Sequence, residues 1–158
     1  MPVRIRPATI ADLPALGRLG AHLMRVHHDF DRLRFLEPGA HPEQGYAAFL
    51  RSQLDDPDCI VLVGDVDGSA AGYVYAAVEP LSWKELRDES GYIHDLIVDP
   101  GARGRNLGSL LLEAACDWLR DRGMPRVVLG TAAANEAAQR LFTRAQFRPT
   151  MVEMTREL

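Results

Sequence analysis

Apolar and polar residues recur along the chain with two different periods, which together predict a mixture of helices and strands. Apolar residues return every three or four positions from Leu13 to about His28 and again from Leu107 to Arg122. This spacing is typical of helices that bury one face. Two further helices are expected, one from Pro42 to about Leu54 and one over Asn135–Ala145. The second half of the chain therefore contains two of the four expected helices.

Short apolar runs between turn-forming residues predict the strands. They are expected at Val3–Ile5, Cys59–Val66, Gly72–Glu79, Gly91–Val98, Arg126–Gly130 and over residues 147–158 at the C-terminus. Asp67–Gly68–Ser69 is a hairpin signal between the second and third strands. Strands that meet by a hairpin in the first half and alternate with helices in the second half describe a mixed sheet. The pattern therefore predicts an α/β or α+β fold.

The composition, 47% hydrophobic and 25% charged over 158 residues, favours a single globular domain over residues 1–158. The net charge of −4 disfavours broad binding to nucleic acid or to an anionic membrane, because both need a positive face. The longest uncharged apolar run, Cys59–Val63, is far too short to span a bilayer, and no signal-peptide pattern is visible. We therefore expect a cytoplasmic protein. We expect no metal site, because the adjacent His27 and His28 have poor spacing for ligands.

A segment rich in glycine and arginine precedes the helix that begins at Leu107. Gly104 and Gly108 allow backbone amides to approach a ligand closely, and Arg103 and Arg105 add positive charge. A helix N-terminus that follows such a loop suits a diphosphate. A tight strand-to-helix turn with two solvated arginines is the alternative. The segment lacks the Lys-Ser/Thr pair of a nucleoside triphosphate loop and the G-x-G-x-x-G of a dinucleotide fold.

On these residues the chain resembles the GNAT superfamily of acetyl-coenzyme A-dependent N-acetyltransferases. The superfamily signature is Arg or Gln, two residues, Gly, one residue, and then Gly or Ala. Arg103–Gly108 matches it, with Asn106 in place of the first signature glycine and Gly108 at the last position. A second motif, an asparagine followed by Leu-Phe and then Gly-Phe, is matched by Asn135, Leu141–Phe142 and Gln146–Phe147. The resemblance covers essentially the whole chain. It implies a GNAT fold, with a mixed sheet of about six to seven strands flanked by about four helices.

The resemblance also implies a site for acetyl-coenzyme A (acetyl-CoA). Amides of residues 104–109 would hold the diphosphate, and residues 96–98 would pair with the pantetheine arm like an added strand. One of the strand amides would polarise the thioester carbonyl. At position 106, asparagine is the residue that best tolerates the left-handed conformation expected there. The implied cofactor-binding residues are Leu96, Ile97, Val98, Arg103, Gly104, Arg105, Asn106, Leu107, Gly108, Ser109, Asn135 and Phe142.

The residues that would transfer protons differ from those that many family members carry. Some family members carry a glutamate at the position of Gly130 and many carry a tyrosine at that of Phe142, and both are absent here. The remaining candidates are His94 and Asp95, with Tyr92 on the same face as His94. Alternation along a strand would point His94 and Asp95 to opposite faces unless a bulge intervenes. Either residue could act as the base, and proton transfer to water alone is the third alternative.

The expected function is acetyl transfer from acetyl-CoA to a primary amine of a small molecule or peptide, by direct attack in a ternary complex. The alternative is a non-catalytic acyl-CoA-binding sensor or regulatory module, because the family glutamate and tyrosine are missing. Residues 25–35 and 80–90 are expected to contact the amine, and the acidic residues Asp29, Asp31, Glu79 and Glu85 could attract it. The alternating residues at the C-terminus would suit an outer strand, so we expect a homodimer.

Overall fold

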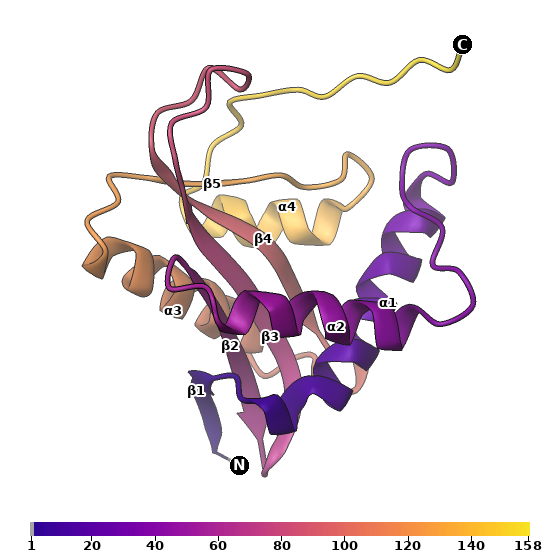
Figure 1. Cartoon of the computed structure of the whole chain (residues 1–158), viewed down its shortest axis with the longest axis vertical. Coiled ribbons are helices and arrows are strands. Elements are labelled where there is room, and N and C mark those ends of the chain that lie inside the picture. Colours follow the sequence, from indigo (N-terminus) through magenta and orange to yellow (C-terminus); the bar gives the residue numbers. More distant parts are fainter. Residues whose placement is uncertain (1) are drawn as a thin grey trace.

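The computed structural model describes residues 2–158 and contains one mixed sheet of five strands in the order β1-β2-β3-β4-β5 (Figure 1). Strands β1 to β4 pair antiparallel with one another, and β5 pairs parallel with β4. The strands are β1 (Val3–Pro7), β2 (Cys59–Val66), β3 (Ser69–Glu79), β4 (Ser90–Val98) and β5 (Val127–Leu129). The mixed α+β architecture expected from the sequence is confirmed, with fewer strands than the expected six to seven.

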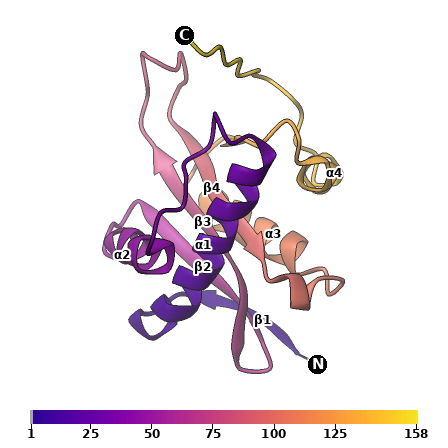
Figure 2. The same cartoon turned by 90° about the vertical axis from the view of Figure 1, so that its right-hand side faces the viewer.

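Helices cover both faces of the sheet, as Figure 2 shows from the side. Helices α1 (Leu13–Phe30) and α2 (Pro42–Leu54) pack on one face, and α3 (Leu107–Asp121) packs on the other. Helix α4 (Glu136–Arg144) lies on the α3 side, and two short 3₁₀ helices, Ile10–Asp12 and Pro100–Ala102, precede α1 and α3. No helix within residues 2–158 is long and apolar enough to cross a membrane.

The two faces of the sheet form two separate hydrophobic cores. Along β3, Val74 and Ala76 join the core beneath α3, whereas Tyr73 and Tyr75 join the core beneath α1 and α2. This division follows from the alternation of side chains along a strand. The apolar stripe of α3 is fully enclosed, with Leu111 among its side chains that expose no surface. The large side chains that expose less than 2% of their surface include Tyr73, Leu16, Leu50, Leu107, Leu111, Leu112, Leu119, Val63 and Val74.

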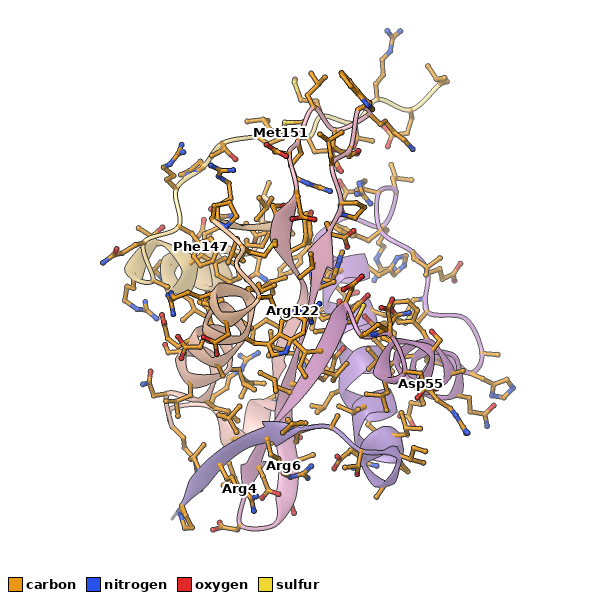
Figure 3. All side chains as sticks on the ribbon, turned by 60° about the vertical axis from the view of Figure 1, so that its left-hand side comes forward. Arg4, Arg6, Asp55, Arg122, Phe147 and Met151 are labelled. Atoms are coloured by element: carbon orange, nitrogen blue, oxygen red, sulfur yellow. The ribbon has the colours of Figure 1, made fainter. Side chains whose placement is uncertain are left out.

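An ion pair fixes the connection between β1 and α1. Both nitrogens at the end of the Arg6 guanidinium donate to the Asp12 carboxylate at 2.8 Å. The Thr9 N–H donates to the same carboxylate, so Asp12 also caps the start of the helical segment. Figure 3 shows Arg6 on the strand that leads into this turn. The hydrogen bonds from Arg6 lower the pKa of Asp12 to about 2.

The strand expected over residues 147–158 is not formed, and this prediction was wrong. The segment leaves α4 in an irregular conformation and runs away from the sheet, through Phe147 and Met151 in Figure 3. Met151, Val152 and Met154 are exposed. A strand needs a neighbour that supplies hydrogen bonds, and the adjoining edge strand, β5, is only three residues long. This missing pairing explains why the sheet has fewer strands than expected.

Candidate functional site

The glycine-arginine loop connects the end of β4 to the start of α3. Asp99 fixes its first turn, because the carboxylate accepts a hydrogen bond from the Gly101 N–H at 2.8 Å. Gly104 then adopts a φ of 85° and Asn106, the N-cap of α3, adopts a φ of 59°. Both angles lie in the left-handed region, where glycine and asparagine are the best-tolerated residues. The conformation expected for Asn106 is therefore confirmed.

This loop presents free backbone amides at the N-terminus of α3. Within residues 2–158, no N–H group from Arg103 to Asn106 donates to another backbone carbonyl. The N–H groups of Leu107, Gly108 and Ser109 lie in the first turn, where a helix offers no acceptor of its own. The Arg103 and Arg105 side chains are exposed beside them. Free amides, the positive end of the helix dipole and two guanidinium groups together favour a phosphate-bearing anion.

Gly108 faces side chains of two elements that are distant in sequence. A methyl group at this position would lie 3.4 Å from Cδ2 of Leu141 in α4 and 3.8 Å from Cγ2 of Val98 in β4. These are ordinary van der Waals distances, so the fold itself does not require glycine here. The missing side chain leaves the backbone of the first turn of α3 uncovered at this position, beside the amides of the loop.

Strand β4 has a partner on its β5 side along only part of its length. Residues 91–93 pair with Val127–Leu129, where β5 ends. Residues 96–98 pair with β3 on the opposite edge, and β5 does not extend far enough to cover their other edge. An uncovered strand edge can accept an extended ligand as an additional strand. The open edge of residues 96–98 leads directly into the glycine-arginine loop.

A β-bulge interrupts β4 at His94. Tyr75 of β3 pairs with Asp95 and Ala76 pairs with Ile93, so His94 is the extra residue between the two pairs. In a regular strand, Ile93 and Asp95 would share a face. Here Ile93 lies in the core beneath α3, whereas Asp95 contacts residues of the α1 and α2 side. Alternation already places His94 on that side, opposite Ile93, and the bulge brings Asp95 to the same side, an outcome that the sequence had left open.

The His94 ring is held between two tyrosine rings. Its centroid lies 4.9 Å from that of Tyr75 and 4.5 Å from that of Tyr92, with interplanar angles of 27° and 26°. His94 Nε2 also lies 2.7 Å from Oε1 of Glu79, at the end of β3. About a third of the His94 side chain, 32%, remains exposed. The imidazole is therefore fixed in orientation while part of it stays accessible to a ligand.

Asp95 is held by two tyrosine hydroxyls. Its Oδ2 accepts a hydrogen bond from Tyr46 of α2 and another, at 2.9 Å, from Tyr73 of β3. Burial raises the pKa of Asp95, although the two hydrogen bonds favour the carboxylate and act in the opposite direction. Burial and the nearby Asp95 charge raise the pKa of both tyrosines, which keeps their hydroxyls protonated. Within the described residues, the second oxygen, Oδ1, has no hydrogen-bond partner and is free to accept one from a ligand.

The region around the end of β5 departs from the family pattern. Tyr92 reaches across from β4, so that a methyl group at Gly130 would lie 3.8 Å from its hydroxyl oxygen. Phe142 of α4 packs against the core beneath α3 and has no hydroxyl to donate. Asn135 caps α4, because its Oδ1 accepts a hydrogen bond from the Ala138 N–H at 3.1 Å. Tyr92 therefore brings a hydroxyl close to Gly130, the position at which the family resemblance implies a glutamate in some members.

The loop, the open strand edge and the order of elements agree with one protein family. The model of the Acetyltransferase (GNAT) family matches residues 24–147, well over half of the chain. The chain belongs to the GNAT acetyltransferase family. The matched range includes β4, the glycine-arginine loop and the segment from Asn135 to Phe147.

Individual relatives differ in how much of their own length this chain covers. The mycothiol acetyltransferase of Clavibacter michiganensis subsp. michiganensis is 35% identical over 123 residues, which are 73% of this chain and 37% of that protein. This GNAT chain therefore spans little more than a third of such relatives. The uncharacterized N-acetyltransferase YhfO of Bacillus subtilis is 28% identical over 142 residues, covering 89% of this chain and 86% of YhfO.

Solved structures share the fold at lower sequence identity. A point mutant of the BH1408 protein from Bacillus halodurans superposes with a TM-score of 0.83 at 22% identity, over 98% of this chain and 99% of that chain. A predicted acetyltransferase of Clostridium acetobutylicum, described with acetyl-CoA, gives a TM-score of 0.73 at 13% identity, over 98% and 96% of the two chains. The GNAT fold expected from the sequence is confirmed.

Three residues of this site were not assigned a role by sequence reasoning. Tyr46 and Tyr73 donate to Asp95, and Glu79, expected only as an acid that could attract an amine, is bonded to His94. Tyr46 lies on a helix 49 residues before Asp95, and no sequence spacing indicates that contact. The pattern of apolar residues also does not predict the bulge at His94, which brings Asp95 to the same side as the histidine.

Proposed function

We propose that this GNAT chain transfers an acetyl group from acetyl-CoA to a primary amine of a small molecule or peptide. The amine attacks the thioester directly in a ternary complex. The observation that carries the proposal is the bulge at His94, which sets two proton-accepting side chains, those of His94 and Asp95, beside the open edge of residues 96–98. The names of the relatives support acetyl transfer as the reaction, and one structural neighbour is described with acetyl-CoA.

The chain offers a continuous surface for coenzyme A. Amides from Gly104 to Ser109, with Arg103 and Arg105, would hold the diphosphate, and the absence of a side chain at Gly108 keeps the approach to them open. Backbone groups of residues 96–98 would pair with the pantetheine arm. Asn135 and Phe142, from the second family motif, would contact the cofactor arm. When bound, acetyl-CoA supplies the activated acetyl group.

The acceptor amine must lose a proton before it can attack. For a lysine-like amine at pH 7 this costs about 4.6 kcal/mol, since its pKa lies roughly 3.4 units above the pH. The free Oδ1 of Asp95 can bind the ammonium form and hold it in the site. His94 can then accept the proton at a ring nitrogen that has no partner within residues 2–158. A backbone N–H of residues 96–98 is suited to stabilise the negative charge that develops on the carbonyl oxygen.

The thiolate of coenzyme A can leave without a proton from Phe142. A thiol with a pKa near 8.5 is a fair leaving group at neutral pH, so the missing family tyrosine is not decisive. We propose that the Tyr92 hydroxyl, which lies near Gly130, donates a hydrogen bond at this end of the site. Tyr92 is therefore the third member of the proposed catalytic group, together with His94 and Asp95.

The test is release of free thiol from acetyl-CoA in the presence of a panel of amines that includes amino acids, amino sugars, polyamines and short peptides. We expect amine-dependent turnover with a sequential kinetic pattern, because both substrates bind before reaction. A ping-pong pattern would contradict direct attack. The variants His94→Gln and Asp95→Asn should each lower kcat and leave the affinity for coenzyme A intact. Saturable binding of acetyl-CoA without turnover on any amine would instead favour an acyl-CoA-binding regulatory module.

A further inference from the structure

The pair formed by Glu79 and His94 joins two neighbouring strands within the proposed acceptor site. The distance between Glu79 Oε1 and His94 Nε2 is 2.7 Å, and the two side chains are 29% and 32% exposed. An ionised carboxylate can only accept hydrogen bonds. The hydrogen of this bond must therefore reside on Nε2 of the imidazole, which assigns the proton to one ring nitrogen.

The other ring nitrogen, Nδ1, is the one left free. Among residues 2–158, no group forms a hydrogen bond with Nδ1 of His94, and the ring stacks on Tyr75 and Tyr92. With the hydrogen on Nε2, Nδ1 carries the lone pair of a neutral imidazole. A proton can then be accepted at Nδ1 without disturbing the bond to Glu79.

We propose that Glu79 is a positioning residue: it fixes the tautomer and the orientation of His94 so that the Nδ1 lone pair faces the acceptor amine. The inference rests on the proposed function, in which His94 is the base. In the step itself, one N–H bond of the ammonium breaks and its proton binds Nδ1. The freed lone pair of the amine nitrogen forms the bond to the acetyl carbon, the C–S bond breaks so that coenzyme A leaves as the thiolate, and the second amine proton passes to solvent. The resulting imidazolium keeps its Nε2–H bond to Glu79 and returns the extra proton to solvent.

The carboxylate contributes in two ways that a neutral side chain of the same shape cannot match. It excludes the tautomer that would place the hydrogen on Nδ1, and it stabilises the imidazolium by a charge-assisted hydrogen bond. Glu79→Gln keeps the size of the side chain but lets the amide donate or accept. A role in packing alone would survive Glu79→Gln, whereas the proposed role would not.

The direct measurement is the tautomer of His94 by NMR of protein labelled with ¹⁵N in its five histidines. The His94→Gln variant identifies the His94 signals by their loss. We expect the neutral imidazole of wild type to carry its hydrogen on Nε2 alone, and Glu79→Gln to show a mixture of both tautomers. Glu79→Asp should restore the single tautomer, because it restores the carboxylate. A hydrogen on Nδ1 in wild type, or an unchanged tautomer in Glu79→Gln, would overturn the proposal.

Kinetics with one accepted amine test whether the tautomer matters for the reaction. We expect Glu79→Gln to lower kcat by about tenfold through lost orientation of the base, with the Kd of coenzyme A unchanged. Glu113→Gln, which changes an exposed acid on α3 away from the acceptor site, should match wild type. A change of tautomer without a change in kcat would also overturn the positioning role. If no amine is accepted, the proposed function fails, and the NMR measurement still decides whether Glu79 sets the tautomer.

Discussion

Replacing Gly108 by alanine separates what the fold needs at this position from what a ligand needs. Gly108 lies in the first turn of α3, and a methyl group there would make only ordinary contacts, 3.4 Å from Leu141 and 3.8 Å from Val98. Alanine is favoured over glycine inside a helix by up to about 1 kcal/mol. For a domain of this size, such a gain raises Tm by about 2–4 °C. We therefore expect the free Gly108→Ala variant to be at least as stable as wild type.

The same methyl group would cover part of the backbone beside the loop amides. We expect it to weaken binding of coenzyme A by at least about tenfold, or about 1.4 kcal/mol, because the diphosphate could no longer approach closely. Ligand at one hundred times Kd stabilises a protein by about 2.7 kcal/mol, and a tenfold weaker affinity reduces this to about 1.4 kcal/mol. The shift in Tm caused by coenzyme A should therefore fall to about half, while Tm without ligand stays level or rises.

Gly45 provides the matched control for this experiment. It also lies in the first turns of a helix, α2, and beyond that helix's own backbone no atom of residues 2–158 lies within 4 Å of a methyl group placed there. Gly45→Ala should raise stability by a similar amount and leave the coenzyme A shift intact. Thermal denaturation of both variants, with and without coenzyme A, is the assay. If Gly108→Ala retains the same ligand-induced shift as Gly45→Ala, the assignment of the diphosphate to this loop is wrong.

Three further predictions concern stability and assembly. Asp12→Asn should cost about 2 kcal/mol at pH 7, because Arg6 lowers the pKa of Asp12 from 3.8 to about 2. That difference between wild type and variant in denaturant titrations should shrink as pH falls from about 4 toward 2, where the carboxylate becomes protonated. Asn106→Val should destabilise the protein by about 1–2 kcal/mol, because a β-branched residue resists the left-handed conformation, and Asn106→Gly should not; thermal melts distinguish them. Light scattering at micromolar concentration should give a dimer mass for the full chain and a monomer mass after removal of residues 149–158, and a monomeric full chain would contradict the expected homodimer.

Much of the fold could be predicted from the sequence, because the features involved are local. The apolar stripe from Leu107 onward specifies a helix with one buried face regardless of its surroundings. The conformation of Asn106 was expected from the family resemblance, which places a glycine at this position, and asparagine is the residue that best replaces glycine at a positive φ. The C-terminal residues show the limit of such reasoning. Their alternating pattern is compatible with a strand, but hydrogen bonds from a neighbouring strand are needed to form one.

The chemistry of the candidate site was determined only in part by the sequence. The sequence identified His94 and Asp95 as candidate proton acceptors, because their side chains can carry a proton and they lie beside the family motifs. Tertiary structure decided that both face the same side, through a bulge that depends on how β4 pairs with β3. It also brought Glu79 to the imidazole and Tyr46 to the carboxylate. These contacts join elements far apart in the chain, and their geometry arises only when the strands and α2 pack together.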